Sequence, residues 1–136
     1  MKLPALNDLL QYQNTKVIHY YCHHHPDLSF DQSQVIFKDL LSWMWLTQKR
    51  KQLRHHTFLF GPLIPLDAMW HAFILHTRDY MAFCEHYFAC YFHHDMEPVG
   101  REYALTPEEF TAFLESCFEY LGEDWVARYF GLAYQA

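Results

Sequence analysis

Glycine is scarce in this chain, and its scarcity limits the possible folds more than any other feature of the sequence. The 136 residues include four glycines, at positions 61, 100, 122 and 131. Long stretches therefore lack the residue that, after proline, weakens a helix most. Apolar residues recur at helical spacing within these stretches, for example at Ile36, Leu40 and Met44. We predict an all-α fold, a compact bundle of five or six helices in a single domain of residues 1–136.

Local signals indicate where several of these helices begin. Ser29 and Gln32 have the spacing of a capping box, and so do Thr106 and Glu109. Asn14 is a favourable N-cap residue for the helix that follows it. Together with the periodic apolar positions, these signals predict helices at about residues 5–11, 16–24, 30–52, 66–92, 107–121 and 125–130.

The composition disfavours several classes of protein. Hydrophobic residues make up 51% of the chain and charged residues 19%, which argues against disorder. The formal net charge of −6 disfavours a nucleic acid partner, because phosphate binding needs a cationic face. No apolar stretch is long enough to cross a bilayer, so a membrane is not expected as a partner either. The N-terminus lacks the apolar run of a signal peptide and the four cysteines form no C-x-x-C pair, so we expect reduced thiols and a cytoplasmic location.

Positive charge is concentrated in one short run of the chain. Four of the ten lysines and arginines lie in residues 49–54, and His55 and His56 follow them. One interpretation is a small docking patch for an acidic partner or for phosphates. The sequence favours a structural interpretation, because cations stabilise the C-terminus of a helix and solvate an exposed turn.

Polar residues that can bind a metal ion interrupt the apolar segment 65–95, which we identify as the core motif of the domain. Asp67 and His71 are four residues apart and therefore share one face of a helix. The carboxylate can hold one imidazole nitrogen and fix the tautomer of the ring, or both groups can bind the same ion. We expect both side chains to turn inward beside a buried Trp70.

Four more candidate ligands lie downstream, at His76, Cys84, His93 and His94. On one straight helix His76 would project about 140° away from His71, and His94 would lie roughly 35 Å from it. A single site therefore requires a break in the helix and a chain that folds back, and Thr77 is the expected N-cap of the second helix. At most one of the two adjacent histidines is expected to join the site, because neighbouring helical residues point about 100° apart.

This segment resembles a known family. The elements Trp70-His71, Thr77-x-x-Tyr80 and His93-His94 are similar to the motif of the glycine-rich-domain-containing-protein-like family, as in a short member of bacterial type. The resemblance covers about 30 of the 136 residues. It implies a fold and a motif, with Trp70, Thr77 and Tyr80 as residues of that motif, and it implies no particular reaction.

Two functions fit these observations. The first, slightly favoured, is a non-enzymatic interaction module with a structural, buried Trp-His motif, whose surplus aromatic residues face a protein partner or a second copy. The alternative is a metal-binding domain for Zn²⁺ or Fe²⁺, possessing catalytic activity if a coordination position is open. Its ligands would be Asp67, His71 and one of the two adjacent histidines, with His76 or Cys84 completing the set. No residue is predicted to be catalytic.

Overall fold

The computed structural model describes residues 2–95 and 105–135, with side chains as far as Gly131. This part of the chain forms seven α-helices, one short 3₁₀ helix and no strand. The helices are α1 (Leu6–Leu9), α2 (Thr15–His24), α3 (Phe30–Gln52), α4 (Ile64–Leu75), α5 (Thr77–Phe88), α6 (Pro107–Leu121) and α7 (Glu123–Gln135), and η1 (Gly61–Leu63) precedes α4. The prediction of an all-α fold is confirmed. None of these helices has both the length and the apolar character that a membrane span needs.

The predicted number of five or six helices is too low. The segment 66–92, expected as one helix, contains most of α4 and the whole of α5, which are separated by His76, and α5 ends at Phe88, before the expected end of the helix. His76 has φ −87° and ψ 67°, outside the helical region, so the hydrogen-bond ladder of α4 ends there. The break therefore occurs where the sequence places it. The N-cap predicted at Thr77 is wrong, because Thr77 is the first helical residue and no side chain caps α5.

The other start signals act as the sequence predicts. The hydroxyl of Ser29 accepts a hydrogen bond from the backbone N–H of Gln32 (3.0 Å), and the Gln32 side chain accepts one from the backbone N–H of Ser29 (2.8 Å). Thr106 and Glu109 form the same reciprocal pair at the start of α6, with both distances at 3.1 Å. At the start of α2, Oδ1 of Asn14 accepts a hydrogen bond from the backbone N–H of Val17. These side chains pair backbone donors that the first helical turn leaves free.

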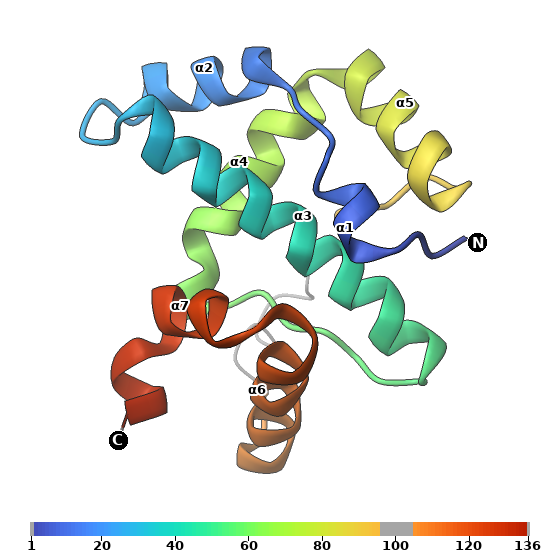
Figure 1. The fold of residues 1–136 in the computed structure, drawn as a ribbon, viewed down its shortest axis with the longest axis vertical. Helices are drawn as coiled ribbons and strands as arrows, with labels where there is room; N and C mark the ends of the chain where they lie inside the picture. Colours follow the sequence, from blue (N-terminus) through green and yellow to red (C-terminus); the bar gives the residue numbers. More distant parts are fainter. Residues whose placement is uncertain (1, 96–104, 136) are drawn as a thin grey trace.

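The long helix α3 crosses the middle of the molecule, and the other helices surround it (Figure 1). It contacts α1, α2, α4 and α6, while α6 and α7 pack on each other at one end of the molecule. A helix with neighbours on several sides is buried around most of its circumference. Accordingly, α3 buries residues 39 to 44 without interruption.

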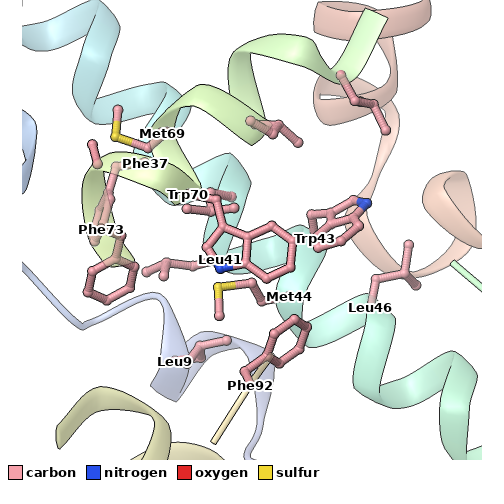
Figure 2. Packing of buried hydrophobic residues seen from close by; sticks show 14 of the residues in the cluster. Leu9, Phe37, Leu41, Trp43, Met44, Leu46, Met69, Trp70, Phe73 and Phe92 are labelled. Atoms are coloured by element: carbon pink, nitrogen blue, oxygen red, sulfur yellow. The ribbon is translucent and has the colours of Figure 1, made fainter. Parts of the chain in front are cut away.

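One hydrophobic core includes buried residues from α1 to α7. Near its centre the rings of Trp43 and Trp70 lie 5.2 Å apart, and the ring of Phe92 lies 5.4 Å from Trp70 (Figure 2). Phe92 belongs to the segment that follows α5, and its ring is buried. This packing attaches the segment after α5 to the side of α4, next to the residues that the sequence predicts as ligands.

Candidate metal centre

The chain reverses after α5 and returns to the start of α4. Ala89 ends α5 in the left-handed conformation (φ 57°, ψ 22°), which is a common way for a helix to terminate. The following residues bring Phe92 into the core and His94 to the side chain of Asp67. The structure thus meets the two conditions that the sequence sets for a single site, a break in the helix and a chain that folds back.

Three of the predicted ligands meet at this place, namely Asp67, His71 and His94. One ligand atom from each lies within 4.8 Å of those from the other two. Nε2 of His94 is 2.7 Å from Oδ1 of Asp67, and Nδ1 of His71 is 3.5 Å from Oδ2. The two imidazole rings have their centres 4.7 Å apart. Within the described residues, no second group of three such side chains comes as close together.

Hydrogen bonds define the protonation of the two rings. Nδ1 of His71 lies 2.7 Å from the backbone carbonyl oxygen of Asp67. Since a carbonyl oxygen can only accept, Nδ1 of His71 carries the proton and Nε2 of the neutral ring keeps a free lone pair. Histidines that bind metals usually donate their second nitrogen in this way. In His94 the proton lies on Nε2, which donates to the carboxylate of Asp67.

The group lies at the surface. The side chain of His71 is 60% exposed, that of Asp67 37% and that of His94 19%. The expectation of a buried Trp-His motif is therefore only half right, because Trp70 is 4% exposed while His71 faces solvent. The physical reason is that neighbouring helical residues point about 100° apart, so the face that buries Trp70 leaves His71 at the edge.

A chain of hydrogen bonds in the core connects the two segments that carry these three side chains. Nε1 of Trp70 donates to the hydroxyl of Tyr80 (2.9 Å), and this hydroxyl donates to the backbone carbonyl oxygen of Phe92 (2.5 Å). Burial raises the pKa of Tyr80 well above its usual range, so the hydroxyl keeps the proton that it donates. The indole of Trp70 also packs against the imidazole of His94, with ring centres 4.0 Å apart. Trp70 and Tyr80 therefore position His94 beside Asp67.

The remaining predicted residues lie apart from this group. Nδ1 of His76 donates to the carbonyl oxygen of Ala72 (2.8 Å), and His93 is exposed. Cys84 is buried, which raises the pKa of its thiol and disfavours the thiolate that metal binding requires. Thr77 is exposed at the start of α5. All four cysteines are free thiols.

The residues that form the candidate centre lie in the part of the chain that a protein-family model matches. The model of the UCP032817-like family matches residues 8–110, about three quarters of the chain. The chain belongs to the UCP032817-like family. That name describes no activity, so the function has to be argued from the site. Comparisons with curated proteins and with solved structures gave no match, and the resemblance to the glycine-rich-domain-containing-protein-like family stays a prediction.

Proposed function

We propose that this member of the UCP032817-like family is a metal-binding domain that holds one Zn²⁺ through Asp67, His71 and His94. The observation that carries the proposal is the convergence of one carboxylate and two imidazoles from two segments of the chain. Zinc binds nitrogen and oxygen ligands at about 2.0–2.2 Å, so ligand atoms around a tetrahedral ion lie about 3.3 Å apart. To reach that spacing from the present distances of 2.7–4.8 Å, the side chains would rotate and Nε2 of His94 would give up the proton that it now donates to Asp67.

The ligand set suits two ions, of which we choose Zn²⁺. Two histidines and one carboxylate occur at both zinc and iron(II) centres. A site of nitrogen and oxygen atoms generally binds Zn²⁺ more tightly than Fe²⁺, which makes Fe²⁺ the alternative ion. Three protein ligands leave a fourth position for water, and the exposed side of His71 gives water access to it.

The alternative function is the interaction module, in which Asp67 and His94 form a hydrogen-bonded pair without a metal. The position of His71 favours the metal. Its Nδ1 is 3.5 Å from the carboxylate and already donates to a backbone carbonyl, so it adds little to such a pair. As a third ligand, its free Nε2 would complete the site. A protein partner or a second copy stays a prediction.

Metal analysis of untagged protein tests the proposal. The protein is stripped of metal with a chelator and dialysed anaerobically against equal concentrations of Zn²⁺ and Fe²⁺. Its metal content is then measured by inductively coupled plasma mass spectrometry. We expect close to one Zn²⁺ per chain, and its loss in His71→Ala and in Asp67→Asn. His86→Ala, which changes an exposed histidine on α5, is the matched control and should keep the metal.

Two results would contradict the metal centre. One is a wild-type chain that retains no ion after dialysis, and the other is equal loss of zinc in His86→Ala and His71→Ala. If the wild type binds no ion and His94→Ala still lowers the melting temperature, the hydrogen-bonded pair of the interaction module is supported instead.

A further inference from the structure

A cavity separate from the proposed metal centre lies where residues 89–95, which we call the return segment, face the C-terminal end of α3. Its volume is about 460 Å³, and its described walls come from the last turns of α3, residues 54–57, residues 90–93 and Asp95. This volume is within the range of pockets that bind small molecules. His93 and Asp95 line the cavity, whereas His94 between them contacts Asp67 of the metal centre.

Two residues that line the cavity each have one buried side-chain oxygen without a hydrogen-bond partner in the described structure. These oxygens are Oε1 of Gln48 and Oγ1 of Thr57, and Gln48 as a whole is only 5% exposed. Buried polar groups are nearly always paired, because an unpaired one lowers stability. Since an amide oxygen can only accept, Oε1 of Gln48 can be paired only by a group that donates a hydrogen bond, as a hydroxyl group does.

Two of the four cations in the basic run 49–54 have structural contacts elsewhere. Lys49 lies over the ring of Tyr120, and Arg50 is buried, where it donates to the hydroxyl of Ser116. These two residues therefore have a structural role, through contacts with α6 that the sequence did not predict.

The other two cations, Lys51 and Arg54, line the cavity and are exposed. Neither forms an ion pair within the described residues. Arg54 has φ 62°, in the left-handed region where glycine or asparagine is usual after a helix. Asp95 is the one carboxylate in the described lining, so the charged groups at the cavity are mainly positive.

We infer that this cavity binds a small organic phosphate that carries hydroxyl groups. Lys51 and Arg54 hold the phosphate, since a lysine and an arginine are typical phosphate ligands in proteins. When the ligand binds, the amide of Gln48 turns so that its Oε1 faces the cavity, and the hydroxyl groups donate to this oxygen and to the carboxylate of Asp95. The inference is independent of the metal centre, because none of the three proposed ligands lines the cavity.

Calorimetric titration with four probes tests the inference. Ribose 5-phosphate carries both a phosphate group and hydroxyl groups. Inorganic phosphate has only the anionic group, and ribose has only the hydroxyl groups. Gluconate has hydroxyl groups and a carboxylate in place of the phosphate. We expect ribose 5-phosphate to bind most tightly and inorganic phosphate to bind more weakly. The titrations use chelator-treated protein and are repeated with His71→Ala, so that a phosphate bound to metal is not mistaken for this site.

Three variants separate the two parts of the site. Gln48→Met keeps the side-chain volume and removes the unpaired oxygen, so it should weaken ribose 5-phosphate binding about tenfold, leave phosphate binding unchanged and raise the melting temperature of the free protein. Lys51→Met and Arg54→Asn should each weaken the binding of ribose 5-phosphate and of inorganic phosphate by at least about tenfold. Lys49→Met removes the same charge outside the cavity and should change neither affinity.

The inference is overturned if no probe binds, if gluconate binds as tightly as ribose 5-phosphate, or if Lys49→Met weakens binding as much as Lys51→Met. Unchanged ribose 5-phosphate affinity in Gln48→Met would also overturn the assigned position of the hydroxyl groups. Binding that persists in His71→Ala supports the cavity whatever the metal content of the wild type, so the two proposals fail separately.

Discussion

At the scale of single residues, the hydroxyl group of Tyr80 connects the two segments that form the proposed metal centre. It accepts a hydrogen bond from Trp70 on α4 and donates one to the backbone of Phe92 on the return segment. His94 follows Phe92 by two residues, so this hydroxyl limits how far the imidazole can move from Asp67. The oxygen of one tyrosine therefore positions a ligand that it does not touch.

Replacing Tyr80 by phenylalanine should lower both stability and metal affinity. The change keeps the ring but leaves the N–H of Trp70 and the carbonyl of Phe92 unpaired in the core. Each unpaired group costs about 1–3 kcal/mol, so we expect the free energy of unfolding to fall by about 2–4 kcal/mol. Urea denaturation measures this loss, and zinc titration of the folded variant should show weaker binding.

Tyr87→Phe is the matched control for this prediction. Tyr87 lies on the same helix, is half-buried, and its hydroxyl makes no hydrogen bond within the described residues. Its replacement should change the free energy of unfolding by less than about 0.5 kcal/mol. Similar losses in the two variants would show that the hydroxyl of Tyr80 has no special role.

At the scale of elements, the proposed centre depends on how α5 ends. Ala89 adopts the left-handed conformation there, although an alanine is strained in that region and glycine is not. Ala89→Gly should therefore raise the free energy of unfolding by about 1 kcal/mol. Ala82→Gly, the same change at an exposed position inside α5, should lower it by about 1 kcal/mol. Thermal unfolding of both variants checks the opposite signs, and a loss of stability in Ala89→Gly would contradict the argument.

Elements with local signals could be predicted from the sequence, whereas the path of the chain between them could not. The capping boxes at Ser29 and Thr106 join residues three apart, so their chemistry is visible in the sequence itself. The contact between Asp67 and His94 spans 27 residues and depends on Phe92 packing in the core. The sequence identified both ligands but had no signal for Phe92 as the anchor that brings them together.

The exposure of side chains was the other feature beyond reach of the sequence. A four-residue spacing places Asp67 and His71 on one helical face, but it does not say whether that face is covered. In the same way, the sequence shows the basic run but not the different contacts of its members. Lys49 contacts a ring on α6, whereas Lys51 lines the cavity, and this difference depends on the position of α6. Neighbouring elements decide both questions.

At the scale of the whole molecule, a buried carboxylate attaches the C-terminal helix to the rest of the core. Asp39 of α3 accepts two hydrogen bonds from Arg128 (2.8 and 2.6 Å) and one from the hydroxyl of Tyr129 (2.6 Å). Nε1 of Trp125 donates to the backbone carbonyl of the same residue (3.2 Å). Burial raises the pKa of Tyr129 above its usual range, so its hydroxyl remains a donor to the carboxylate.

The proposed metal centre is built from α4, α5 and the return segment, none of which carries a partner of Asp39. Asp39→Asn should therefore lower the stability of the molecule while leaving the zinc content of the folded chain unchanged. The amide loses the ion pair and directs an N–H group at donors, and the partly exposed Arg128 recovers some hydration. We expect the free energy of unfolding, measured by urea denaturation, to fall by about 2–3 kcal/mol. The control is Asp27→Asn, which changes an exposed carboxylate and should leave this free energy almost unchanged. If folded Asp39→Asn also loses its zinc, the centre depends on the C-terminal helices, and the separation of the two parts is wrong.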